Sequence, residues 1–241
     1  MKFFLLFISL ASLAQNNLLN IKINSVNYND SLANRRVYQI NYQIENTSNN
    51  DVQFFLNPNS LIAQAASSMT LFAVYKMYRN GVYDAMDGPF YEKNFAEQDD
   101  VEDMKDFNSP TATALLVKLQ EKYKKLKDDY VAVYKKNGGL NSDEQWIFKN
   151  QKLLQSIVTL QPGQTKNFTI KTSWRRNRYF KIADNEYYLD EKDKFEIQLQ
   201  LILNKSDRNA ELSATEFLKI KSNPNFIEGT FTSNRSEISF N

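Results

Sequence analysis

Apolar and polar residues alternate over long stretches near the beginning and the end of the chain. Residues 37–46 place their apolar side chains on one face: Tyr38, Ile40, Tyr42 and Ile44. Residues 195–203 show the same period without a break. A period of two is typical of strands with one buried face. We expect further strands at 19–28, where the phase shifts before Val26, at 52–56 and at 158–172.

A helical period replaces this alternation in the middle of the chain. Apolar residues recur at spacings of four and three: Ala112, Leu116, Leu119, Tyr123, Leu126, Tyr130 and Val133. Ser109 is a suitable N-cap, Pro110 suits the first helical position, and Asn137-Gly138-Gly139 is a stop signal. A capping-box pattern from Ser142 opens a second helix. The glycine link between them predicts an antiparallel helical hairpin.

Three other segments are less regular. Residues 60–90 combine a short helix or loop with a hairpin, because Asn80-Gly81 between apolar runs is a strong hairpin signal. Residues 92–107 are acidic and are expected to form a solvated loop. Residues 226–240 fit a final hairpin that turns near Ser233-Asn234.

The strand regions resemble a known family of folds. The pattern Leu160-x-Pro162-Gly163 before a strand, followed by alternation through 189–199, resembles the later half of secreted bacterial immunoglobulin-like and fibronectin-III-like domains. Phe195 stands where such domains often carry a tyrosine whose hydroxyl closes a corner. The resemblance covers 18–57 and 158–240. It implies an antiparallel β-sandwich in which the helical hairpin, at about 92–157, is inserted. The expected fold is thus mainly β with α, in a single domain over 15–241.

The first 14 residues have the organisation of a signal peptide. Lys2 precedes an apolar run at 3–13, and Ser12-Leu13-Ala14 forms a small-x-small cleavage site. The run is shorter than the roughly 20 residues that a membrane span needs. We therefore expect export to the periplasm or the exterior. The chain has no cysteine, so we do not expect a lipoprotein.

Composition narrows the chemistry further. The 241 residues include neither histidine nor cysteine, which excludes imidazole and thiolate catalysis and the usual zinc ligands. The six glycines do not form a phosphate-binding loop. A net charge of +2 argues against nucleic-acid binding. We expect no cofactor, no metal and no membrane span.

The candidate binding residues form one basic–aromatic cluster: Trp174, Arg175, Arg176, Arg178 and Tyr179. Arginine and aromatic side chains together bind anionic glycans, phosphate groups or acidic proteins. The alternative is a strand end with Trp174 in the core and the arginines in water. Acidic clusters at 99–106 and 184–193 are hypothetical calcium sites, although a solvated surface is favoured because neither shows an EF-hand pattern.

These observations predict an exported, non-catalytic interaction module of the bacterial cell envelope that binds a protein partner. One alternative is a carbohydrate-binding module that uses Trp146, Trp174, Tyr187 and Tyr188. A third is a carboxylate-dependent hydrolase, because glycoside hydrolysis requires only two acidic residues. A coplanar row of exposed aromatic rings would favour glycan binding. An apolar strip left uncovered on the long helix would favour a protein partner.

Overall fold

The computed structural model describes residues 18–32, 35–63, 71–84, 90, 109–175, 181–182, 185–186 and 192–240. This part of the chain is mainly β with three α-helices, which confirms the predicted class. The predicted signal peptide at 1–14 and the acidic stretch at 92–107 lie outside the described residues.

The first sheet contains three antiparallel strands in the order β1-β2-β8. β1 (Leu19–Leu32) pairs with β2 (Arg35–Asn46), and β2 pairs with β8 (Thr165–Arg175). The four alternating apolar residues of β2 are fully buried, as predicted. The β1–β2 register shifts between Ile23 and Ser25, which returns Val26 to the inner face and explains the change of phase in the sequence.

The second sheet has the order β12-β11-β5-β4, with β6 paired to β5. Its strands are β4 (Asn57–Ala63), β5 (Phe72–Arg79), β6 (Val82–Asp84), β11 (Phe195–Leu203) and β12 (Gly229–Ile238). Asn80 and Gly81 join β5 to β6 with φ angles of 51° and 81°, as the predicted hairpin requires. β4 pairs with β5 in parallel, so the expectation of purely antiparallel strands is wrong for this pair. Residues 60–63 belong to β4 and are not helical.

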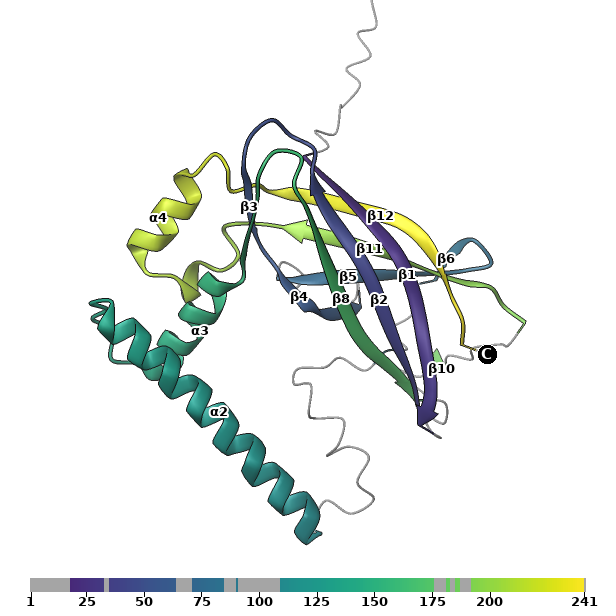
Figure 1. Ribbon diagram of the computed structural model, residues 1–241, viewed down its shortest axis with the longest axis horizontal. Coiled ribbons are helices and arrows are strands. Elements are labelled where there is room, and N and C mark those ends of the chain that lie inside the picture. The colour runs from purple at the N-terminus through teal and green to yellow at the C-terminus, as the bar shows by residue number, and fades with distance from the viewer. Residues whose placement is uncertain are drawn as a thin grey trace, which may run out of the picture.

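One hydrophobic cluster joins the two sheets. It takes Ile40 and Ile170 from the first sheet, and Met77, Leu199 and Ile238 from the second. In Figure 1, β1, β2 and β8 lie together, and β5, β11 and β12 cross behind them. The core therefore consists of the alternate, inward-facing residues of both sheets.

β12 is one continuous strand, so the predicted hairpin at 226–240 is wrong. The Asn234 side chain does not form a turn but bridges to β1: Oδ1 accepts from the Ile23 N–H at 2.8 Å, and Nδ2 donates to the Ile23 carbonyl at 3.3 Å. Ser233 Oγ accepts from the Leu199 N–H at 2.9 Å, where the β11–β12 register shifts. The two polar side chains thus take ladder hydrogen bonds at a strand irregularity.

A second, smaller cluster lies at one end of the sheets, where β3 (Val52–Phe55) pairs with β7 (Ile157–Leu160). Its buried members are Phe55, Leu153, Leu212, Ile220 and Phe226. They bring together α3 (Glu144–Gln155), the 3₁₀ turn η1 (Asn209–Glu211) and α4 (Ala214–Ser222), a helix that the sequence analysis does not predict. A separate pair of short strands, β9 (Lys181–Ile182) and β10 (Asn185–Glu186), completes the described strands.

The long helix, α2 (Pro110–Lys136), has the predicted bounds, and Ser109 Oγ accepts from the Ala112 N–H at 3.2 Å. In α3 (Glu144–Gln155) the capping residue is Asp143, whose carboxylate accepts from the N–H groups of Gln145 and Trp146. The negative charge of Asp143 also interacts favourably with the positive, N-terminal end of the helix dipole.

α2 and α3 contact each other as crossed helices. Near the start of α3, Gln145 Nε2 donates to Tyr123 OH at 3.4 Å, while at its end Gln155 Oε1 accepts from Tyr130 OH at 2.6 Å. These two tyrosines are about 10 Å apart along α2, whereas Gln145 and Gln155 are about 15 Å apart along α3, and the start of α3 meets the earlier of the two tyrosines. The side-by-side antiparallel hairpin is therefore not confirmed.

Candidate functional site

The structure describes Trp174 and the backbone of Arg175, the last residue of β8. The other predicted binding residues, Arg176, Arg178 and Tyr179, lie outside the described residues. The Trp174 ring meets Phe240 edge-on, with centroids 5.3 Å apart, and packs against the main core. This placement agrees with the alternative prediction for Trp174, in which its ring packs in the core at the end of a strand.

The aromatic residues suggested for glycan binding do not form an open row where the structure describes them. Trp146 is half-buried, packs edge-on to Tyr134 and donates from Nε1 to the Ala210 carbonyl at 3.0 Å. Tyr83 is 46% exposed, but its ring lies at 65° to that of Tyr78. Tyr187 and Tyr188 lie outside the described residues.

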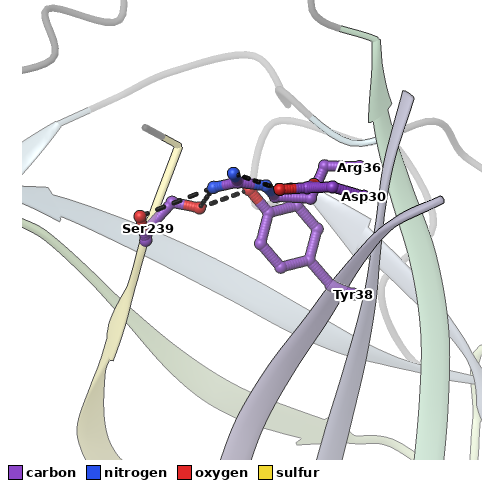
Figure 2. A network of polar contacts seen from close by, with 4 residues as sticks. All are labelled: Asp30, Arg36, Tyr38 and Ser239. Carbon is purple, nitrogen blue, oxygen red and sulfur yellow. Dashed lines mark hydrogen bonds and ion pairs between the residues drawn. The ribbon is translucent and has the colours of Figure 1, made fainter. Parts of the chain in front are cut away.

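A partly buried polar network links β1 and β2 to the C-terminal end of the chain (Figure 2). We call Asp30, Arg36, Tyr38 and Ser239 the Arg36 network. The Asp30 carboxylate accepts two hydrogen bonds of 2.7 Å from Nε and Nη2 of Arg36. Arg36 Nη1 and Tyr38 OH both donate to the Ser239 carbonyl, at 2.9 and 2.6 Å. All three guanidinium nitrogens therefore have acceptors within the protein.

The electrostatics of the Arg36 network fit a structural role. The hydrogen bond to Asp30 raises the pKa of Arg36 against the opposing effect of burial. Arg36 also lies 4.0 Å over the Tyr28 ring. Because its charge is already paired and stacked, we assign it to fastening the last residues onto the first sheet. A signal for the burial of Arg36 is present in the sequence, because Arg36 has the same phase as the buried Tyr38 and Ile40.

A second cation–aromatic cluster lies on the outer face of the second sheet. The guanidinium of Arg235 stacks 3.5 Å above the Tyr78 ring and donates to the Gly81 carbonyl at 3.2 Å. Tyr78 OH donates to Gln198 Oε1 at 2.7 Å. These contacts hold the β5–β6 hairpin against β11 and β12.

The acidic residues do not gather into a metal site in the part of the chain that is described. The cluster at 99–106 lies outside that part. Of the cluster at 184–193, only Asp193 has a described side chain, which accepts from Asn80 Nδ2 at 2.7 Å and lies 3.6 Å from Arg79 Nη1. Asp193 therefore supports the β5–β6 turn.

The apolar stripe of α2 divides into packed and exposed members. Tyr123 and Tyr130 both meet the Phe148 ring of α3 edge-on, with centroids 5.2 and 5.4 Å away. Leu126 and Val133, from the same stripe, are 47% and 48% exposed. The helix is turned so that its tyrosines face α3, and the leucine and valine lie to one side.

These exposed positions continue along the helix. We call four residues the α2 strip: Leu115, Leu119, Leu126 and Val133. They fall within about 40° of one another around the helix and span about 27 Å of its length. Leu115 and Leu119 are half-buried. Leu116, beside them, is 40% exposed. The α2 strip is thus an apolar line along α2 with two exposed members, Leu126 and Val133, and two half-buried ones.

Comparison of the chain with protein-family models, curated proteins and solved structures finds no match. Among the described residues, no helix combines the length and the apolar character needed to cross a bilayer.

Proposed function

We propose that the protein is an exported, non-catalytic interaction module of the bacterial cell envelope, an immunoglobulin-like β-sandwich with a helical arm that binds a protein partner. The observation that carries the proposal is the α2 strip. Leu126 and Val133 recur seven residues apart on a helix whose Tyr123 and Tyr130 pack on α3. Exposed apolar side chains on one side of a helix are typical of interaction sites.

The scaffold supports this use of α2. Asn150 of α3 is fully buried, and its Nδ2 donates to the Glu211 carbonyl at 3.0 Å and to Glu216 Oε2 at 2.8 Å. Leu153 of α3 belongs to the second hydrophobic cluster. α3 is thus fastened to the sheets on one side and carries α2 on the other, so that the strip is presented on a fixed element.

Neither alternative function receives comparable support. The two tryptophans suggested for sugar binding make packing contacts, and Tyr78 and Tyr83 are not coplanar. No pair of described carboxylates stands out as an acid and a nucleophile for hydrolysis. A protein partner therefore remains the favoured ligand.

The test is quantitative affinity capture with the full protein from the envelope fraction of its source cells, using a double variant, Leu126→Gln with Val133→Gln. Glutamine is a good helix former, so α2 should persist. Replacing the apolar side chains of Leu126 and Val133, each about half exposed in the free protein, is expected to reduce the free energy of partner binding by about 2 kcal/mol, which is about thirtyfold in Kd. The matched control is Leu218→Gln, because Leu218 is an exposed leucine of α4.

A protein captured by the wild type and by Leu218→Gln, but lost with the double variant, would support the proposal. Urea unfolding of all three proteins would show that the fold is retained. Equal capture by all three would refute the assignment of the α2 strip. Specific binding to a glycan array, unaffected by the double variant, would favour the carbohydrate-binding alternative.

A further inference from the structure

Positive charge is concentrated on the helix that carries the α2 strip. α2 contains seven lysines and three acidic residues, a net charge of +4, whereas the whole chain has a net charge of +2. The remainder of the chain is therefore net negative. This asymmetry places the basic character of the protein beside its exposed apolar surface.

The lysines are also distributed unevenly around α2. Three exposed lysines border the strip on the side away from α3, and we call them the lysine edge: Lys118, Lys125 and Lys136. Asp129 is the one acidic residue of α2 within this edge. On the opposite side of the strip, Lys127 is already paired with Glu144 of α3 at 3.1 Å. The strip therefore has a basic border on one side and a packed, charge-balanced border on the other.

The dimensions of the strip favour a helix over a flat surface as its occupant. An apolar arc of about 40° that repeats every seven residues is the narrow seam of a helix–helix contact. A helix lying on a bilayer buries a wide apolar face and carries basic residues along its polar face. Here α3 crosses one side of α2 and places the half-exposed Glu144 carboxylate there.

The charge of the lysine edge argues against a second copy of this chain as the occupant. Two copies of α2 packed through their strips would bring lysine edges of the same sign together, and like charges at these positions are unfavourable. A helix with glutamate or aspartate beside its apolar seam would instead form ion pairs with the edge.

We propose that the partner presents an acidic amphipathic helix, which packs its apolar seam on the α2 strip and pairs its carboxylates with the lysine edge. This inference rests on the proposed function, because it names the chemistry of the partner bound there. The strip supplies the apolar contact, and the edge selects the partner by charge and sets its orientation.

The test uses two synthetic helical peptides of three heptads with the same leucine seam, one flanked by glutamates and the other by lysines. Fluorescence anisotropy measures their binding to the full protein at low and high salt. The glutamate peptide is expected to bind and to weaken with salt, because exposed ion pairs are screened. The lysine peptide is expected not to bind.

Two triple variants of equal net charge give the matched comparison. Lys118→Gln, Lys125→Gln and Lys136→Gln together should weaken glutamate-peptide binding about tenfold at low salt. Lys22→Gln, Lys171→Gln and Lys219→Gln, which are exposed lysines elsewhere, should leave it unchanged. Equal binding of both peptides, equal effects of both triple variants, or no peptide binding would overturn the inference.

Vesicles of phosphatidylglycerol form the remaining arm. Lysine-dependent binding to vesicles without peptide binding would identify an anionic membrane as the ligand and overturn the inference.

The inference and the proposed function can fail separately. If partner capture is lost with Leu126→Gln and Val133→Gln but kept with the lysine-edge triple variant, the protein-binding function stands and the acidic partner is refuted.

Discussion

Replacing Asp30 by alanine is expected to destabilise the fold more than replacing its partner, Arg36, by methionine. The reason is the unequal burial of the two side chains: that of Arg36 is 3% exposed, whereas that of Asp30 is 36% exposed. Without Asp30, a buried guanidinium keeps only the acceptors of Ser239. Without Arg36, the Asp30 carboxylate can be hydrated, and the Ser239 carbonyl still accepts from Tyr38 OH.

The expected magnitudes follow from this geometry. Breaking a buried ion pair by removing one partner costs about 3–5 kcal/mol, and the exposure of Asp30 reduces this to about 2–3 kcal/mol for Asp30→Ala. Methionine at position 36 retains most of the packing and loses the contact with the Tyr28 ring, which gives a cost of about 1 kcal/mol. The double variant should be more stable than Asp30→Ala alone, because it contains no unpaired buried charge.

Urea unfolding of the four proteins, followed by far-ultraviolet circular dichroism, gives the double-mutant cycle. Equal m-values would show that the changes act on stability and not on the compactness of the unfolded chain. The reasoning is refuted if Arg36→Met costs more than Asp30→Ala, or if the two effects simply add. Either result would mean that the guanidinium is not a buried charge dependent on Asp30.

Two further predictions concern the sheets. Asn234→Ala should lower the free energy of unfolding in urea by about 1–3 kcal/mol, because it removes the side-chain partners of the Ile23 N–H and carbonyl groups. The control Asn20→Ala removes one exposed hydrogen bond to Glu45 and should cost less than about 0.5 kcal/mol. Equal costs would contradict the bridging role of Asn234. Burial raises the pKa of Tyr42 above its ordinary value of 10.0, so the stability from keeping its phenol neutral is fully present below pH 10 and is lost as the pH rises further. Wild type should therefore lose about 1.4 kcal/mol per pH unit more than Tyr42→Phe above pH 10, and parallel stability–pH curves would exclude this effect.

Local sequence signals predicted the elements whose structure depends on neighbouring residues. α2 begins and ends where Ser109, Pro110 and the Asn-Gly-Gly stop signal place it, because caps satisfy backbone groups within one turn. The β5–β6 hairpin forms at Asn80-Gly81 for a similar reason, since both residues adopt the positive φ that its turn requires. The alternation in β2 and β11 also identified the inward faces correctly.

The misses arise where contacts distant in sequence decide the structure. Ser233-Asn234 has turn-forming residues, yet both side chains instead bond to β11 and β1, more than 30 and 200 residues away. α4 has a capping box in which Ser213 and Glu216 bond reciprocally, but its nine residues bury little apart from Ile220. A helix this short depends on the second hydrophobic cluster, which the sequence does not display locally.

The candidate site was only partly visible in the sequence for the same reason. The heptad stripe of α2 identified the correct helix, but the spacing alone did not distinguish its covered members from its exposed ones. The crossing of α3 decides which members are covered: Phe148 meets Tyr123 and Tyr130, and leaves Leu126 and Val133 to one side. The crossing depends on the position in which the second hydrophobic cluster holds α3. The periodicity of α2 carries no information about that position.

The unequal use of polar and apolar groups in the two parts of the molecule supports a division between scaffold and binding surface. In the sheets and in α3, buried polar side chains such as Asn46, Arg36 and Asn150 have hydrogen-bond partners, as a stable fold requires. α2 differs from the sheets. It is about 40 Å long but is crossed by α3, which is only about 18 Å long, so Leu126 and Val133 remain exposed to water along its side. Folding gains little from apolar residues at such positions, because a glutamine there would favour the helix as well. The α2 strip is therefore best explained by a contact beyond those that the described residues make.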